Sequence, residues 1–280
     1  MAITSRRLLA SGQSWTAHDV VCAAGPEDRP FEERHDWACI AVVKQGTFQY
    51  RTSYGRATLA PGALLLGDAG QCFECSHEHG IGDRCLSFHF APDYFERIVA
   101  DVRGARLPFT VPRFAPSESL IPLLVAADPA PHDAMELEEI ALRLAGLVAT
   151  RLSRTATSAA TPSRHNERRM SEAVRRLEAD PETPTTLTAL ARNCGMSPYH
   201  FLRTFRSVVG ITPHQFVLAQ RLRRAAVRLR GSDEPISRIV FDAGFNDLST
   251  FNRRFRRVMG ATPTAFRRVR HRALPRLPGA

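Results

Sequence analysis

The side chains with the most reactive chemistry in this sequence gather in residues 72–85. Cysteine and histidine occur there at Cys72, Cys75, His77, His79 and Cys85. In an extended strand, Cys75, His77 and His79 share one face, because side chains alternate with a period of two. Thiol and imidazole ligands together favour zinc, copper or iron over magnesium or calcium. The candidate metal ligands are therefore Cys75, His77, His79 and Cys85.

The spacing of these residues does not match a closed four-ligand site. The paired C-x2-C motif of a zinc ribbon is absent, and cysteine is also a common small buried residue. We therefore expect no stoichiometric metal, no cofactor and dispensable thiols. A metal- or redox-responsive site over residues 72–85 remains the alternative, with His35 as a further candidate member.

Length and composition place the chain among ordinary globular proteins. It has 280 residues, 44% of them hydrophobic and 24% charged, which suggests two domains. No apolar run approaches the roughly 18 residues of a membrane span, and the start lacks the apolar core of a secretory signal. Six cysteines are too sparse for a disulfide scaffold, so we expect reduced thiols and a cytoplasmic protein.

The positive charge is confined to one part of the chain. Residues 1–163 contain 15 Lys and Arg against 19 Asp and Glu, whereas residues 164–280 contain 23 Arg against 9 Asp and Glu. A basic excess in one segment is typical of polyanion binding. A solvated basic face is the alternative that charge alone leaves open.

The N-terminal half has the pattern of short strands. Residues 37–43 and 47–52 flank Lys44-Gln45-Gly46, which predicts a hairpin. Residues 85–90 alternate, with Leu86, Phe88 and Phe90 on one face. Short strands separated by Gly and Pro turns favour a β-sandwich or small barrel. Apolar residues at helical spacing predict a helix over 135–152, and the Ser-, Thr- and Ala-rich residues after it predict a linker.

The C-terminal part contains an internal repeat with a spacing of fifty residues. FLRTFRSVVGITPHQF (201–216) and FNRRFRRVMGATPTAF (251–266) are identical at nine of sixteen positions. A match this dense indicates one structural unit that occurs twice.

Each copy has the signals of a helix-turn-helix. Ser197 and Asp247 stand at N-cap positions, and Gly210 and Gly260 stand where the longer helix must end. A short apolar helix and a glycine turn precede each longer helix, which is the pattern whose second helix enters the DNA major groove. A connecting helix over 213–229, about 26 Å long at ~1.5 Å per residue, would hold the two recognition helices in successive grooves. The phenylalanines at helical spacing are expected in the core: Phe201, Phe205, Phe251 and Phe255.

These residues resemble the DNA-binding domain of AraC/XylS-type bacterial transcription regulators. The resemblance covers about residues 168–270. It is carried by LTALARNCGMSPYHFLRTFRSVVGITPHQFV, by RLRRAAVRLR, and by ISRIVFDAGFNDLSTFNRRFRRVMGATPTAFR. Val240 departs from the family, which usually has Ala there, and should need a small repacking. The resemblance implies a sequence-specific DNA-binding transcription regulator.

The resemblance also implies which positions meet DNA: Tyr199, Leu202, Arg203, Leu248, Ser249, Asn252 and Arg253. The chemistry of three of them suits base reading, because arginine pairs bidentately with guanine and asparagine with adenine. The two leucines offer only apolar contact. One turn later, Arg206, Arg256 and Arg257 are expected at phosphates, which position the protein without specifying sequence.

The N-terminal half resembles the cupin-like effector domain often fused to this DNA-binding domain. The resemblance is carried by His35-Asp36-Trp37, VVKQGT at 42–47, LAPGALLLG at 59–67 and GQCFECSHEHG at 70–80. It implies a barrel that holds a small molecule or metal in its mouth, and a helix over 135–152 that dimerises. A helix that merely covers the barrel is the alternative.

The expected fold is α+β and multidomain. A cupin-like β-barrel or jelly roll with a following helix is expected over 1–153, and a linker over 154–166. An all-α domain with two helix-turn-helix units joined by a linker helix is expected over 167–270, and a tail over 271–280.

The expected function is a DNA-binding regulator, not an enzyme, whose N-terminal domain senses a small ligand. A cupin metalloenzyme with an accessory DNA-binding domain is a remote alternative: an H-x-H motif is missing, because residue 33 is Glu and leaves His35 alone. A purely architectural DNA binder would have no use for the non-basic half. The expected partners are double-stranded DNA, an unknown small-molecule effector, RNA polymerase if the protein is an activator, and a second copy through 135–152. No membrane partner is expected.

Overall fold

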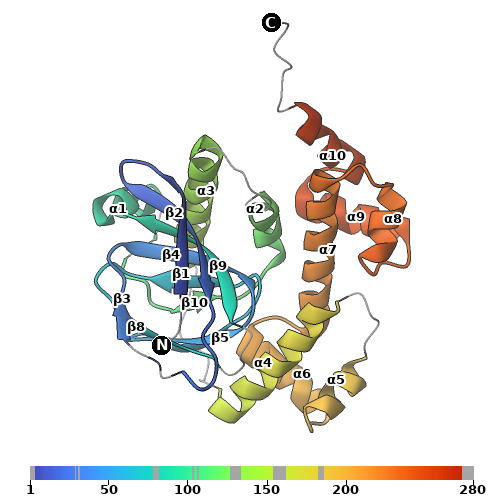
Figure 1. Ribbon diagram of the computed structural model, residues 1–280, viewed down its shortest axis with the longest axis horizontal. Helices are drawn as coiled ribbons and strands as arrows, with labels where there is room; N and C mark the ends of the chain where they lie inside the picture. Colours follow the sequence, from blue (N-terminus) through green and yellow to red (C-terminus); the bar gives the residue numbers. More distant parts are fainter. Residues whose placement is uncertain are drawn as a thin grey trace, which may run out of the picture.

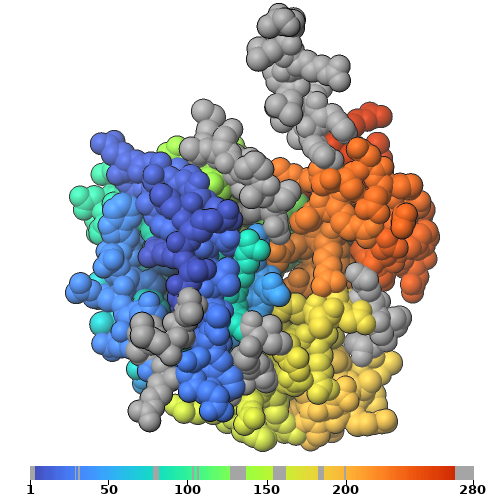
Figure 2. All heavy atoms as spheres, viewed as in Figure 1, coloured from blue at the N-terminus to red at the C-terminus, as the bar shows by residue number. Residues whose placement is uncertain are grey.

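Strands fill the N-terminal half of the protein and helices fill the C-terminal half. The computed structural model describes residues 4–28, 30, 32–77, 82–102, 104–105, 107–126, 134–153, 162–181 and 186–272. The two parts lie side by side and touch along a long seam (Figure 1 and Figure 2). The predicted α+β class, with a strand-rich N-terminal part and a helix-turn-helix C-terminal part, is confirmed.

Two antiparallel sheets face each other in the N-terminal part, which we call the sandwich. The six-stranded sheet has the order β1 (Thr4–Ser11), β2 (Trp15–Cys22), β9 (Asp83–Phe90), β4 (Ala38–Gln45), β7 (Leu64–Gly67), β10 (Arg113–Phe114). The four-stranded sheet has the order β3 (Glu32–Arg34), β8 (Cys72–Ser76), β5 (Phe48–Thr52), β6 (Gly55–Leu59). One core, which includes Val43, Tyr50 and Leu59, fills the space between the sheets.

The hairpin predicted around Lys44-Gln45-Gly46 is wrong. Both edges of β4 are already paired, with β7 and β9, so β5 has no free edge beside it. The chain instead turns at Gly46, whose φ of 80° suits glycine, and β5 joins the other sheet. The local sequence contains a turn signal, but strand pairing is decided by residues far along the chain.

Helices cover the outer face of the six-stranded sheet. They are α1 (Pro92–Ala100), the short helix η1 (Glu118–Leu120), α2 (Ile121–Ala126) and α3 (Ala134–Leu152). The helix predicted over 135–152 is confirmed as α3. Its apolar residues Leu137, Ile140 and Leu144 are buried in the same core as Leu86 and Phe88 of β9. These apolar residues of α3 therefore pack against the sheet, and Leu142 on the same helix is 40% exposed. Dimerisation through α3 stays a prediction.

The helical part begins earlier than predicted. The side chain of Ser163 accepts a hydrogen bond from the backbone N–H of Asn166 and starts the helix α4 (Arg164–Ala179), within the predicted linker. The remaining helices are α5 (Leu187–Asn193), α6 (Pro198–Val209), α7 (Pro213–Gly231), α8 (Ile236–Asp242), α9 (Leu248–Met259) and α10 (Pro263–Arg272). Residues 154–161 of the linker and 273–280 of the tail lie outside the described residues. Within the described ranges, no helix is both long and apolar enough to cross a bilayer.

Candidate nucleic-acid interface

Two helix-turn-helix units form where the repeat predicts them, as α5–α6 and α8–α9. The Ser197 hydroxyl accepts the N–H of His200 at 3.3 Å and caps α6. The Asp247 carboxylate accepts the N–H groups of Ser249 and Thr250 at 3.1 and 2.7 Å and caps α9. A hydrogen bond from the Thr250 side chain, together with those from the two backbone N–H groups, lowers the pKa of Asp247. Both recognition helices therefore begin at a fixed residue.

The two recognition helices also end alike. Gly210 closes α6 with a φ of 96°, and Gly260 closes α9 with a φ of 75°. This left-handed conformation is the C-terminal signal expected of a helix that stops at glycine. The repeated sequence thus predicted both ends of both helices.

Each unit buries one face of its recognition helix. The four phenylalanines predicted for the core are fully buried: Phe201, Phe205, Phe251 and Phe255. Val240 is fully buried in the second of these cores beside Ile239 and Phe251, so the larger side chain is accommodated. Burial of the aromatic faces leaves the opposite faces of α6 and α9 for a partner.

The predicted DNA-contact residues divide by exposure. Those with exposed side chains are Arg203 and Arg206 on α6, and Ser249, Asn252, Arg253, Arg256 and Arg257 on α9. Leu202 and Leu248 are half-buried, and Leu248 packs at the edge of the second core. Tyr199 lies near the start of α6, but its side chain is outside the described part of the structure.

Comparison with known proteins identifies these two units. A family model described as a helix-turn-helix domain matches residues 190–269. The regulatory protein SoxS of Escherichia coli K12 is 35% identical over 86 residues, which are 31% of this chain and 80% of SoxS. This chain belongs to the AraC/XylS family of transcription regulators.

Two other proteins match about two-fifths of this AraC/XylS regulator. The bifunctional transcriptional activator/DNA repair enzyme Ada of Escherichia coli K12 is 36% identical over 108 residues, 39% of this chain and 30% of Ada. The chain therefore spans less than a third of Ada. A crystal structure of the DNA-binding domain of AdpA with a target DNA is 28% identical and covers 39% of this chain and 97% of that one, with a TM-score of 0.36.

In this AraC/XylS regulator the sandwich holds the ends of both recognition helices through one segment, residues 113–126. Arg113 donates hydrogen bonds to the carbonyl oxygens of Val208 and Val209, at 2.6 and 3.0 Å, at the last turn of α6. Burial lowers the pKa of Arg113 to about 10. Glu118 forms an ion pair with Arg257 of α9 at 3.0 Å. Arg257, which was predicted to contact a phosphate, is thus held in an ion pair by the N-terminal part.

The same segment continues into the second helix-turn-helix core. Ile121 and Val125 of α2 are buried there with Leu222 and Ala225 of α7. Arg230 of α7 donates to the Val125 carbonyl at 2.9 Å. No local pattern in the sequence signals these contacts, because they join residues about a hundred positions apart.

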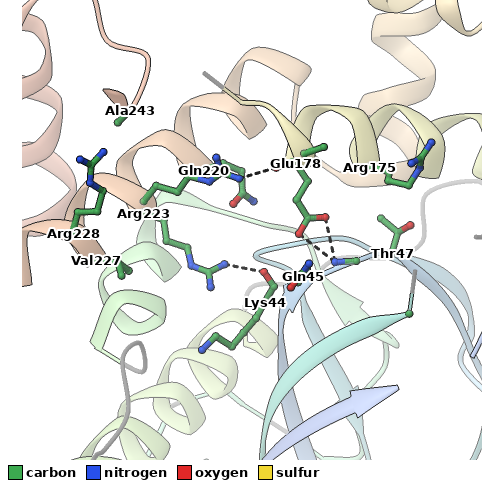
Figure 3. Close-up of a pocket in the computed structure, with 14 residues that line it drawn as sticks. Lys44, Gln45, Thr47, Arg175, Glu178, Gln220, Arg223, Val227, Arg228 and Ala243 are labelled. Atoms are coloured by element: carbon green, nitrogen blue, oxygen red, sulfur yellow. Dashed lines mark hydrogen bonds between the residues drawn. The ribbon is translucent and has the colours of Figure 1, made fainter. Parts of the chain in front are cut away.

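A second group of contacts joins the sandwich to α4 and α7. Arg56 pairs with Glu167 at 2.8 Å, and the Glu167 side chain is 2% exposed. The Glu178 carboxylate accepts the N–H of Gly46 at 3.2 Å, and Arg223 donates to the Lys44 carbonyl at 3.0 Å (Figure 3). Burial raises the pKa of Glu178. The contacts of Glu178 and Arg223 border a cavity of about 620 Å³ between the two parts.

A cavity of about 380 Å³ lies within the sandwich. Arg6 and His89 both line it, and Arg6 is hydrogen-bonded to Nε2 of His89 at 2.8 Å. The His35 ring stacks on Phe73 with ring centres 4.1 Å apart, and its Nε2 lies 2.8 Å from the Tyr50 hydroxyl. Burial, together with the charge of Arg6, lowers the pKa of His35 to about 4 and of His89 to about 3. Both imidazoles are therefore neutral near pH 7.

The cysteine and histidine cluster is only partly assembled as predicted. Cys75 and His77 line the same cavity, as expected for one face of a strand. Cys85 also lines it, with its Sγ 3.5 Å from Asp83 Oδ1. Burial raises the pKa of both thiols well above its ordinary value. His79 lies outside the described residues.

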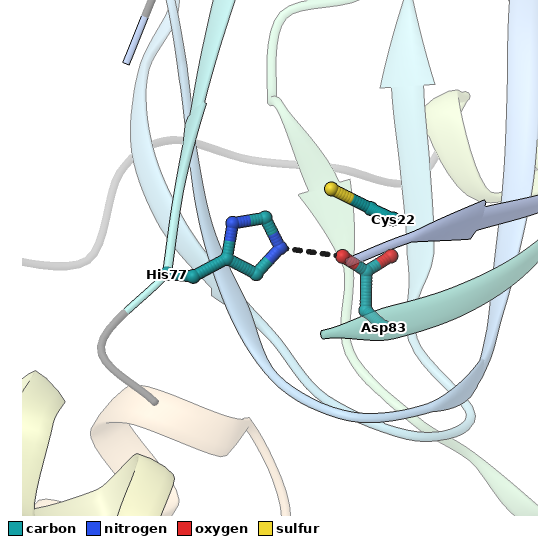
Figure 4. Close-up of side chains that lie close together, drawn as sticks. All are labelled: Cys22, His77 and Asp83. Atoms are coloured by element: carbon teal, nitrogen blue, oxygen red, sulfur yellow. Dashed lines mark hydrogen bonds and ion pairs between the residues drawn. The ribbon is translucent and has the colours of Figure 1, made fainter. Parts of the chain in front are cut away.

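The ligand-type atoms that converge are instead those of Cys22, His77 and Asp83, all within 4.8 Å of one another (Figure 4). Burial alone would lower the pKa of His77, but hydrogen bonds with Asp83 and Cys22 outweigh it and raise the pKa to about 9. Cys22 was not predicted as a member of this cluster, because it lies 55 residues before His77 in the sequence.

Proposed function

We propose that this regulator reads two successive major grooves with α6 and α9, and that a small ligand bound in the sandwich controls this activity. The observation that supports the first part is the pair of matched recognition helices. Each is capped at its start, closed by glycine at its end, and exposes arginine on the face opposite its buried phenylalanines.

We assign base reading to one turn of each helix and phosphate contacts to the next. Arg203 and Arg253 are the candidates for bidentate pairing with guanine, and Asn252 for pairing with adenine. Tyr199, Leu202, Leu248 and Ser249 complete the proposed base-facing set. Arg206, Arg256 and Arg257 are assigned to phosphates; Arg257 must leave Glu118 to reach one.

Footprinting on a selected site tests this arrangement. The full chain would first select binding sites from a random duplex library, and hydroxyl radicals would then map the protected backbone. We expect two protected patches about one helical turn (~34 Å) apart on one face. Affinity should fall steeply with salt, because arginine–phosphate contacts release counterions. A single protected patch, or an affinity for DNA that does not change with salt concentration, would contradict the proposal.

The proposed ligand is a small, largely apolar molecule with one carboxylate. The 380 Å³ cavity has the size of a small-molecule site and apolar walls that include Phe48, Phe73 and Leu65. Arg6 supplies a cation beside neutral His89, and Arg34 also lines the cavity. An arginine on the wall of an apolar cavity favours an anionic group beside it. In this proposal the cavity corresponds to the mouth of a cupin-like barrel.

Thermal unfolding of the full chain with matched probes tests the ligand chemistry. Benzoate and 1-naphthoate should raise the melting temperature more than benzyl alcohol does, because only the acids can pair with Arg6. Arg6→Gln should remove the difference. Arg7→Gln is the matched control, because Arg7 is the next residue on β1 and pairs with Asp19 at 3.0 Å instead. Equal effects of acids and alcohol, or no loss in Arg6→Gln, would contradict the proposal.

A further inference from the structure

Three side chains that commonly bind metals converge from separate stretches of the sandwich. Cys22 ends β2, His77 follows β8, and Asp83 begins β9. The His77 Nε2 and Asp83 Oδ2 atoms are 2.6 Å apart, and these side chains are 3% and 7% exposed. The three ligand-type atoms lie within 4.8 Å of one another (Figure 4).

We propose that Cys22, His77 and Asp83 bind one divalent transition-metal ion, with zinc the best match. Sulfur, imidazole nitrogen and carboxylate oxygen are the three donor types that zinc takes in proteins. A thiolate in the set disfavours magnesium and calcium, which take oxygen ligands. The metal site lies in the wall of the ligand cavity of the proposed function, but metal binding does not depend on that proposal.

The geometry suits an ion that replaces a proton. In a tetrahedral zinc site with bonds of roughly 2.0–2.1 Å, two ligand atoms lie about 3.3 Å apart. The nitrogen and oxygen atoms of His77 and Asp83 are 2.6 Å apart, with a shared proton between them. Side-chain rotations that part them by less than an ångström would make room for the ion.

Three protein ligands leave a fourth position open. Cys22, His77 and Asp83 all line the 380 Å³ cavity, so this position faces the cavity and is available to water or to a bound molecule. Three ligands with an open fourth position distinguish a reactive or exchangeable zinc site from a closed structural one.

The site is also in packing contact with the seam between the two parts. A Cβ on Gly82 would overlap the carbonyl oxygen of Cys22, and a Cβ on Gly46 would overlap the carbonyl oxygen of Gly82. Gly46 in turn donates its N–H to Glu178 of α4. Close backbone contacts therefore connect the site to Glu178 of α4, the first helix of the DNA-binding part.

Metal titration of the full chain tests the proposal. After treatment with chelator and buffer exchange, Zn²⁺ titrated by calorimetry should bind at one ion per chain. Cys22→Ser, His77→Ala and Asp83→Asn should each weaken binding by about tenfold or more. Cys72→Ser and His214→Gln are the matched controls on β8 and α7, and should bind as the wild type does. No saturable binding by the wild type, or binding by the three ligand variants as tight as that of the wild type, would overturn the proposal.

A measurement on the wild type keeps the test decisive if a variant fails to fold. Cys22 is half-buried and Cys72 is exposed, and both are free thiols. Zn²⁺ should slow alkylation of Cys22 by iodoacetamide relative to Cys72, as measured by peptide mass spectrometry, and chelator should restore it. Co²⁺ should give a sulfur-to-cobalt charge-transfer band. An unchanged alkylation ratio, or a missing band, would overturn the proposal.

Discussion

Replacement of Arg113 by Met should loosen the contact between the sandwich and α6. Arg113 donates two hydrogen bonds to the carbonyl oxygens of Val208 and Val209. Charge-assisted bonds of this kind contribute about 1.5–3 kcal/mol each, so the pair contributes about 3–6 kcal/mol. Burial opposes this, because it lowers the pKa of Arg113 to about 10, which corresponds to about 3 kcal/mol. The expected net loss is therefore at most about 3 kcal/mol.

Urea unfolding and hydrogen exchange of the full chain measure this effect. The free energy of unfolding should fall by the stated amount in Arg113→Met. Amide exchange should accelerate in the last turn of α6 and at Gly210, and should stay unchanged in α9. Arg143→Met is the control, because Arg143 is an exposed α3 residue whose ion pair is with Glu139 of the same helix. Unchanged amide exchange in the last turn of α6, or equal acceleration in α6 and α9, would refute the reasoning.

Three further predictions test the local physics of the fold. Gly210→Ala should destabilise the protein more than Gly260→Ala does. Both substitutions force about 1–2 kcal/mol of left-handed backbone strain, but only the methyl group at position 210 would meet Ala115. Equal losses of free energy in urea unfolding would contradict this packing. His35→Phe should flatten the pH dependence of stability. The folded-state pKa of His35 is about 4, below the ordinary 6.5, so the unfolded chain binds the proton first, and up to about 3 kcal/mol of stability is lost as pH falls through this range. An unchanged slope between pH 4 and 6.5 in urea unfolding would count against it. Asp247→Ala should cost about 1 kcal/mol in thermal unfolding through the lost N-cap, and Asp247→Asn less; equal costs would contradict the cap.

Sequence alone predicted the helix-turn-helix units because their signals are local. An N-cap, a glycine at the helix end and two phenylalanines four residues apart all act within about fifteen residues. The capping bonds of Ser197 and Asp247 and the left-handed Gly210 and Gly260 occur at the predicted positions. Such signals need no knowledge of the rest of the chain.

The parts that sequence did not predict depend on distant residues. The turn at Gly46 was read as a hairpin because the sequence around it does not reveal that β7 and β9 already occupy both edges of β4. Cys22 was missed because it reaches His77 and Asp83 only after the sheets have formed. The contacts of Arg113 and Glu118 with the recognition helices likewise join residues far apart in the chain. The roles proposed for the DNA-facing side chains rest on family resemblance and exposure, and stay predictions.

The most direct test of the account compares two arginines of α9 on two DNA sequences. Fluorescence anisotropy would measure the affinity of the full chain for a selected site and for a scrambled duplex at one salt concentration. Arg253→Ala should lose about 1–3 kcal/mol on the selected site and much less on the scrambled one, whereas Arg256→Ala should weaken binding to both alike. Arg203→Ala and Arg206→Ala should repeat this contrast on α6. If the two variants of each pair behaved identically on both sequences, the assignment of α6 and α9 as the base-reading helices would be contradicted.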